Sequence, residues 1–229
     1  MVERTRNLGL VASNICTPSV VSLLDRKNTA KFIETIRNCG KVLHQFGCTK
    51  LGILVEEINW HGGKNRHEYL LEESQREIRQ RQQDNFVHAL KQVAPIAESE
   101  GIVLVTECQD TLVDHVDYFL TAWEQGVDIV REVDSPAVLL TFDAYHHQIN
   151  EGNLIDSITK YTDLVGHIHI ADVPGRHEPG TGEINFLNLL LAAKRAGYEG
   201  YIGLECAPTT NEQEALAPIM KIVEEVNRT

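Results

Sequence analysis

The sequence predicts a single α/β domain, a (β/α) barrel in which parallel strands alternate with crossover helices. Short apolar runs rich in β-branched residues alternate with longer segments of helical period. No stretch rich in proline, glycine or serine divides the 229 residues. Several apolar runs also end on an acidic residue, as expected where strands deliver functional side chains to one rim of a barrel. We therefore treat residues 1–229 as one domain.

Six segments have the composition of strands, because each is short, apolar and bounded by polar or turn-forming residues. They are Leu8–Ser13, Lys50–Glu56, Ile102–Glu107, Ala137–Phe142, Val165–Ile170 and Tyr201–Glu205. A full barrel of this kind has eight strands, so the sequence predicts two fewer than closure requires.

The segments between these strands have helical spacing. Thr29–Phe46 places Phe32, Ile36 and Leu43 on one stripe, and Gly47 is suited to end that helix. Further helices are expected at Gln82–Glu100, bent or interrupted near Pro95, and at Val116–Val133, Leu154–Tyr161, Phe186–Ala196 and Asn211–Asn227.

The charge balance disfavours a polyanionic partner such as nucleic acid. The formal net charge is −12 and the pI about 5.3. The densest basic group, Arg76–Arg81, alternates with glutamate and glutamine and is typical of a solvated helix face. No apolar run has the length of a signal peptide core or a membrane span, and the five cysteines are scattered. We expect a cytoplasmic protein with reduced thiols and no membrane partner.

Four potential metal ligands lie at or near the ends of successive predicted strands: Glu107, Asp143, His169 and Glu205. They are separated by 36, 26 and 36 residues, which is about one β/α unit each, so parallel strands would bring them to one rim. Each alone has a structural explanation, as a helix cap or a buried histidine. Together, three carboxylates at apolar strand ends would repel one another unless a cation or protons compensated. This set of oxygen and nitrogen ligands suits Mg²⁺ or Mn²⁺, with Mn²⁺ slightly preferred because of the histidine.

The run HIHIADVPGRHEPGTGEINF, together with TECQD, FDAYHHQ and GLECAP, resembles the hydroxypyruvate isomerase group of the xylose isomerase-like TIM barrels. The similarity is densest from Ile102 to Pro208. The resemblance implies that Glu107 and Glu205 act both as metal ligands and as the acid/base pair, while Asp143 and His169 complete the metal shell. Matched to this family, the chain lacks the first two β/α units of the eight.

The resemblance also implies an activity. It is a metal-assisted aldose-ketose type isomerisation of a small α-hydroxycarbonyl compound, of the hydroxypyruvate or tartronate semialdehyde type, by proton transfer through an enediolate. His146 and Arg176 resemble family residues that hold substrate oxygens, and the planar fork of arginine suits a carboxylate. From the residues alone, His146 reads as a surface histidine and Arg176 as the partner of Glu178 in a loop ion pair.

Other interpretations remain open. His169 stands where close hydroxypyruvate isomerases often carry glutamine and epimerase relatives carry histidine, which favours a ketose 3-epimerase or another keto-sugar isomerase as an alternative. A catalytically impaired, truncated barrel acting as a binding protein is a second alternative. A DNA-repair enzyme like endonuclease IV is disfavoured, because it would need more histidine ligands and a basic groove.

Two glycine-containing segments are predicted to be loops, and two of the predicted strands are expected to be sheet edges. The segment NWHGGKNRHE could form a mobile lid or a plain connection, and GRHEPGTGE lacks the GK[ST] ending of a phosphate loop and is expected to shape the rim. The absent strands would leave Leu8–Ser13 and Tyr201–Glu205 as unpaired edges. We expect a second copy of the chain to cover them, unless the chain is a shortened product of a longer gene.

Overall fold

A computed structural model describes residues 1–18, 22–55, 75–116 and 118–228. Its strands form one parallel sheet in which each pairs with the next along the chain, in the order β1 to β6. The strands are β1 (Ile15–Cys16), β2 (Lys50–Ile53), β3 (Val103–Glu107), β4 (Val138–Asp143), β5 (Val165–Ile170) and β6 (Ile202–Leu204). The sheet curls into part of a barrel, which confirms the predicted fold class, and the six strands of the described residues agree with the predicted number.

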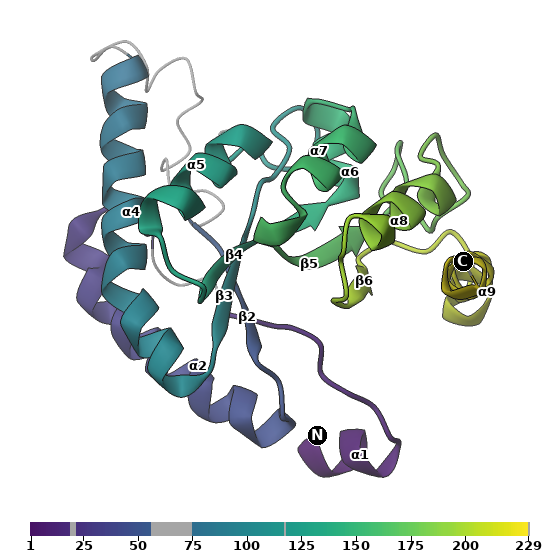
Figure 1. The fold of residues 1–229 in the computed structure, drawn as a ribbon, viewed down its shortest axis with the longest axis horizontal. Helices are drawn as coiled ribbons and strands as arrows, with labels where there is room; N and C mark the ends of the chain where they lie inside the picture. Colours follow the sequence, from purple (N-terminus) through teal and green to yellow (C-terminus); the bar gives the residue numbers. More distant parts are fainter. Residues whose placement is uncertain (19–21, 56–74, 117, 229) are drawn as a thin grey trace.

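The helices lie in an arc around one side of the sheet (Figure 1). They are α1 (Val2–Asn7), η1 (Arg26–Asn28), α2 (Thr29–Phe46), α4 (Gln75–Glu100), α5 (Trp123–Val133), α6 (Ala144–Asn150), α7 (Leu154–Lys160), η2 (Thr162–Leu164), α8 (Phe186–Arg195) and α9 (Glu212–Arg228). None of the helices in the described ranges is both long enough and apolar enough to cross a membrane.

The main core lies between the sheet and the helices. Alternate residues of the central strands, such as Leu140, Phe142 and Ile168, are fully buried there. The ring of Trp123 on α5 meets that of Phe142 edge-on, with centroids 5.0 Å apart. Because side chains alternate along a strand, the residues between these face the barrel interior. Burial of the apolar set therefore fixes which side chains reach the interior, and that interior set includes Asp143.

The first strand is Ile15–Cys16, so the prediction of Leu8–Ser13 is wrong. Ile15 pairs with Leu51, close to the point where β2 begins, and residues 8–13 run past that point where β2 offers no backbone partner. Apolar content alone suggested a strand. Without a neighbouring strand the ladder of hydrogen bonds cannot form.

Two helix boundaries also differ from the prediction. Helix α4 begins at Gln75, earlier than the predicted Gln82, because helix-forming residues continue the helix and Ile78 extends its buried face. Helix α5 begins at Trp123 and not at Val116. The side-chain amide of Asn150 in α6 donates to the backbone carbonyl of Thr121 (2.9 Å). The segment before Trp123 is therefore bonded to α6 and not to helical neighbours. The structure also adds α1 and α6, which the sequence did not indicate.

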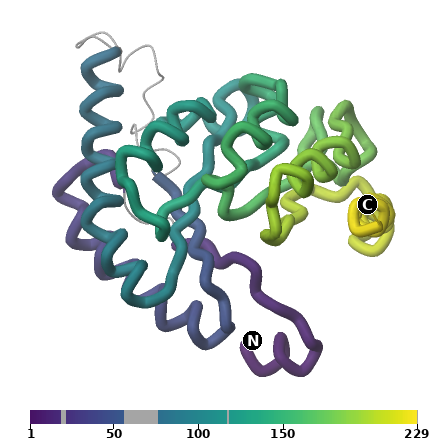
Figure 2. Tube along the Cα trace, viewed as in Figure 1, coloured from purple at the N-terminus to yellow at the C-terminus, as the bar shows by residue number. Residues whose placement is uncertain are grey.

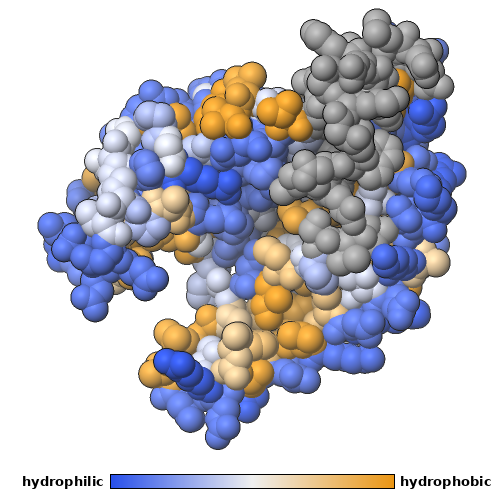
Figure 3. Space-filling view, turned by 180° about the vertical axis from the view of Figure 1, so that it is seen from behind, coloured by the Kyte–Doolittle hydropathy of each residue, from blue (hydrophilic) through white to orange (hydrophobic). Residues whose placement is uncertain are grey.

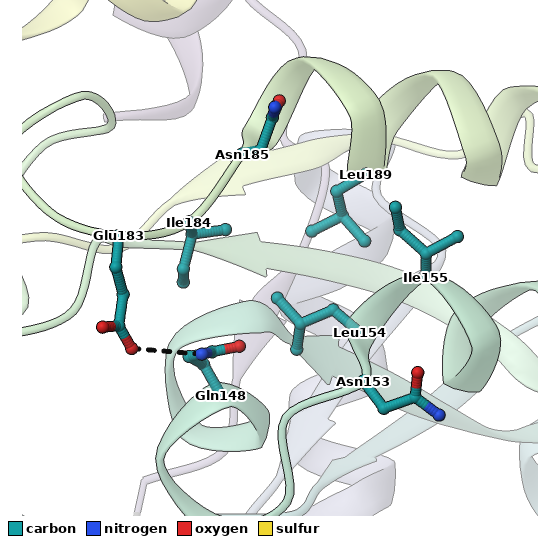
Figure 4. A pocket seen from close by; sticks show the side chains of 8 residues that line it. All are labelled: Gln148, Asn153, Leu154, Ile155, Glu183, Ile184, Asn185 and Leu189. Atoms are coloured by element: carbon teal, nitrogen blue, oxygen red, sulfur yellow. Dashed lines mark hydrogen bonds between the residues drawn. The ribbon is translucent and has the colours of Figure 1, made fainter.

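One side of the barrel is open. Among the described residues β1 and β6 each pair with a single strand, so both are sheet edges. The N-terminal end of the chain (purple) and the C-terminal helix (yellow) lie on the two flanks of the opening (Figure 2). The space-filling view shows a hollow there with hydrophobic side chains gathered beside it (Figure 3). Leu8, Leu10 and Val11 are 61 to 64% exposed.

Candidate metal and catalytic centre

Four successive strands bring Glu107, Asp143, His169 and Glu205 together, as the sequence predicted. Glu107 and Asp143 end β3 and β4, His169 lies in β5, and Glu205 follows β6 directly. Asp143 is in register with His169, and His169 with Gly203 of β6. One potential ligand atom of each of the four residues lies within 4.8 Å of those of the other three. The parallel register therefore gathers side chains that are far apart in sequence.

The imidazole of His169 lies at the centre of this group. Its Nδ1 is 2.9 Å from Oε1 of Glu107, 3.2 Å from Oε2 of Glu205 and 3.9 Å from Oδ2 of Asp143. The side chains of Asp143 and Glu107 are 1% and 12% exposed, whereas that of Glu205 is 49% exposed. The centre is therefore enclosed on the β3–β4 side and accessible beside β6.

The charges in the centre explain its pKa shifts. Burial lowers the pKa of His169, but the hydrogen bonds and negative charges of Glu107 and Glu205 outweigh this and raise it to about 10. The contacts with His169 and with Arg176 bring the pKa of Glu205 to about 2 in spite of its burial, and those with His169 lower the pKa of Glu107 as well. At neutral pH an imidazolium therefore stands between two ionised carboxylates.

Asp143 is different, because burial first and the charge of Glu107 second raise its pKa to about 6. Its Oδ1 accepts hydrogen bonds from the backbone amides of Tyr145 (2.7 Å) and His146 (3.1 Å), and so caps α6. Its Oδ2 is the atom nearest to His169. One carboxylate thus starts a helix with one oxygen and offers the other oxygen to the centre.

The residues of the centre fit a divalent cation. Three carboxylates and one imidazole supply four donors of the oxygen and nitrogen type within a small volume. Gly203 leaves space for them, since a Cβ at this position would lie 2.9 Å from Cδ2 of His169 and 3.1 Å from Nε2 of His167. Any other residue in the middle of β6 would displace an imidazole.

The two predicted substrate-binding residues lie beside this centre. Arg176 pairs with Glu205 (Nη2 to Oε2, 3.0 Å) and with Asp114 (Nη1 to Oδ2, 3.3 Å). The sequence-based alternative of a pair with Glu178 is wrong, because that carboxylate accepts from the backbone amide of Thr209. His146 is fully buried rather than on the surface, with Nδ1 2.7 Å from Oδ2 of Asp110.

Sequence reasoning missed three residues next to the centre. Asp110 supports His146, and Asp114 and His115 lie within reach of the same imidazole. Asp110 was present in the motif TECQD, but nothing in its spacing distinguished it from a solvated loop residue. All three lie between β3 and α5, where no periodicity predicts side-chain direction.

The loop that carries Arg176 is anchored by one buried carboxylate. The Oδ1 of Asp172 accepts from the amides of Val173 (3.0 Å) and Ile184 (3.1 Å), and its Oδ2 from those of Gly180 (2.8 Å) and Gly182 (2.9 Å). This confirms that GRHEPGTGE shapes the rim. The predicted lid, NWHGGKNRHE, lies outside the described residues, as does Glu56 at the end of the second predicted strand.

We expect Asp172→Asn to lower the free energy of unfolding by about 2 to 4 kcal/mol, because an amide offers one acceptor oxygen and turns its NH₂ group toward backbone donors. Urea denaturation would measure the change. Asp163→Asn, at an exposed position in η2, is the matched control and should stay within about 0.5 kcal/mol of the wild type. Equal stability of the two variants would contradict the anchoring role.

The fold places the chain in a known class of barrel proteins. The chain belongs to the family of xylose isomerase-like TIM barrels, whose family model matches residues 1–223. Within it, hydroxypyruvate isomerase of Escherichia coli is 34% identical over 134 residues, which make up 57% of this chain and 50% of that protein. The 2-oxo-tetronate isomerase of Cupriavidus necator is 34% identical over 131 residues, with the same two coverages. The chain spans about half the length of the curated relatives it matches.

Solved structures show the same fold. An AP endonuclease of family 2 from Brucella melitensis superposes with a TM-score of 0.82 at 22% identity, covering 96% of this chain and 81% of that one. L-ribulose 3-epimerase superposes with a TM-score of 0.76 at 20% identity, covering 99% and 80%. At this identity the likeness establishes the architecture, and the chemistry has to be argued from the site.

Proposed function

We propose that this chain is an isomerase that moves a proton between adjacent carbons of a small α-hydroxycarbonyl compound, of the hydroxypyruvate or tartronate semialdehyde type. The observation that carries the proposal is the pair Glu107 and Glu205, which contact the same atom, Nδ1 of His169, from the end of β3 and from the residue after β6. Two carboxylates at one centre can take a proton from one carbon and return it to the next. The similarity to the two isomerases supports this reaction class.

Each glutamate has a distinct position for this task. Glu107 is enclosed, so water competes little for its carboxylate, whereas Glu205 is half-exposed and can exchange its proton with solvent. Both have lowered pKa values and are ionised at neutral pH, as a base must be. Loss of the His169 proton would remove the hydrogen bonds that hold these pKa values down. Their basicity would then move toward the range where proton transfer is efficient.

The residues that would hold a divalent cation are Glu107, Asp143, His169 and Glu205, and we propose Mn²⁺ or Mg²⁺ from the three carboxylates among them. When bound, such a cation supplies Lewis-acid polarisation of a carbonyl and its neighbouring hydroxyl. Arg176 supplies a fixed guanidinium beside Glu205, stacked 5.2 Å from the ring centroid of Tyr145, and can receive a substrate carboxylate. The ring of His146 is buried, with Nε2 4.0 Å from Oδ2 of Asp143.

Incorporation of solvent deuterium tests the function. The metal-free chain, supplied with Mn²⁺ or Mg²⁺, is incubated in D₂O with hydroxypyruvate, 2-oxo-tetronate or a neutral ketose, and the carbon next to the carbonyl is followed by NMR. We expect exchange with a keto acid. Absence of exchange with every compound, in a chain shown to bind Mn²⁺, would refute the proposed activity and favour a binding protein.

A ketose 3-epimerase is the second candidate, and the resemblance noted in the sequence favours it through His169. The two candidates differ in their dependence on Arg176. A keto acid uses the guanidinium as a counter-charge, so Arg176→Ala should raise KM strongly for hydroxypyruvate. A neutral ketose would show little change in KM. The kcat/KM of the wild type for hydroxypyruvate is compared with that for a neutral ketose, and the higher value identifies the substrate class.

We also propose that a second copy of this chain covers the open side. Each edge strand presents unpaired backbone groups, and Leu10 and Val11 are exposed beside the opening. Sedimentation velocity should therefore show a dimer or larger species at micromolar concentration. The double variant Leu10→Glu, Val11→Glu should shift it toward monomer, because charge replaces apolar surface. A wild type that stays monomeric across the concentration range would overturn this.

A further inference from the structure

A second group of potential ligands adjoins the four-residue centre. Asp114 and His115, between β3 and α5, and His146 of α6 each offer one ligand atom, and these atoms lie within 4.8 Å of one another. The rings of His115 and His146 meet at 66° with centroids 5.1 Å apart. We call these three residues the Asp114 cluster.

Both imidazoles have unpaired nitrogens. His146 is fully buried and its Nε2 has no hydrogen-bond partner within the described ranges. The same holds for Nδ1 and Nε2 of His115, which are also shielded from solvent. Buried nitrogens without partners are costly, and a native structure seldom leaves three of them in two touching rings without a ligand.

Asp110 holds the ring of His146 in place. The Oδ1 of Asp110 accepts from the amides of Val113 (2.8 Å) and Asp114 (3.0 Å), and its Oδ2 lies 2.7 Å from Nδ1 of His146. A proton on Nδ1 leaves a lone pair on Nε2, as in carboxylate–histidine pairs that orient metal ligands.

The donor types of this cluster differ from those of the first centre. Two imidazoles and one carboxylate form the ligand set of an open zinc site, with a fourth position free for water or substrate oxygen. The first centre has three carboxylates and suits a harder ion. Arg176 contacts Oδ2 of Asp114, and Tyr145 is hydrogen-bonded to the same carboxylate, so a cation would share this ligand with both.

We propose that Asp114, His115 and His146 form a second divalent cation site, selective for zinc-like ions. It goes beyond the proposed isomerase function, which requires only the first centre. The two sites are neighbours, since His146 follows Asp143 by three residues on the first turn of α6.

Zinc stoichiometry tests the proposal. The untagged, metal-free chain is dialysed against Zn²⁺, and bound zinc per chain is measured by elemental analysis. We expect two ions in the wild type and one in His115→Ala. His44→Ala is the matched control, because it removes an exposed histidine from the last turn of α2, and it should retain two. His115→Asn, checked by circular dichroism, repeats the test if the alanine variant folds poorly.

Cobalt provides an independent readout. Co²⁺ bound to two imidazoles and a carboxylate absorbs in the visible region, and titration of the wild type should give two components. His115→Ala should lose one component, and Glu107→Gln should weaken the other. Equal zinc content and equal cobalt spectra in His115→Ala and the wild type would overturn the second site. That result would leave the deuterium exchange assay unaffected, so failure of this inference is separable from failure of the isomerase.

Discussion

Replacing Glu107 with glutamine is expected to reduce deuterium exchange into the substrate by about 100-fold to 10,000-fold, the usual contribution of a positioned acid or base. Glutamine keeps the shape of the side chain and an oxygen donor, but it cannot take up a proton at neutral pH. Because the side chain of Glu107 is enclosed, bulk water has little access to replace it in this role. Glu205→Gln should have a comparable effect on the second proton transfer.

The comparison needs a folded protein and a matched control. Glu199→Gln alters an exposed glutamate between α8 and β6 and should exchange at the wild-type rate. Mn²⁺ binding should be measured for each variant, since Glu107 and Glu205 are both proposed ligands as well as the proposed acid/base pair. Exchange at wild-type rate in Glu107→Gln would remove this residue from the acid/base role, even if the chain proves to be an isomerase.

Cation affinity should rise about tenfold per pH unit between about pH 6.5 and 8.5. The pKa of His169 is about 10, so the imidazole must release one proton before it can ligate. Below about pH 6, Asp143 is protonated as well, and the slope should steepen toward two protons. Titration calorimetry with Mn²⁺ in two buffers of different ionisation enthalpy would measure the number of protons released.

The stability of the metal-free protein should change with pH in the direction opposite to its cation affinity. A histidine whose folded pKa lies above its ordinary value contributes stability below about pH 6.5, and this contribution is lost as the pH rises toward 10. The metal-free chain should therefore become less stable over the range in which its affinity for the cation increases. His169→Gln is the control, because glutamine has no proton to release. A wild type that binds Mn²⁺ without proton release would contradict the charge state assigned to His169.

The sequence was most informative where apolar runs are long and regular. The strand Val165–Ile170 and the helix Thr29–Phe46 were predicted with their observed boundaries, since each has a clear buried stripe. The strand-end acids were also predictable, because one β/α unit has a nearly constant length and parallel strands share a rim. The prediction was wrong at Leu8–Ser13, where strand formation depends on a partner in space and not on composition.

The parts of the site that the sequence did not reveal lie in loops. The contact between Asp110 and His146 joins residues 36 positions apart, and the pair of Arg176 with Asp114 joins residues 62 apart. Neither follows from periodicity, because both depend on how the segment between β3 and α5 folds over the rim. The buried state of His146 likewise depends on α6, a short helix whose first amides are capped by Asp143.

The position of Glu205 has a mechanical consequence. It follows a three-residue edge strand that is held to the sheet on one side only. A cation bound to Glu205 and to ligands on β3, β4 and β5 would hold the edge strand β6 against the interior strands. Amide hydrogens of Ile202–Leu204 should then exchange with solvent more slowly once Mn²⁺ is added, while those of β3 change little. The cation would therefore stabilise the edge of the sheet in addition to its proposed role in the reaction.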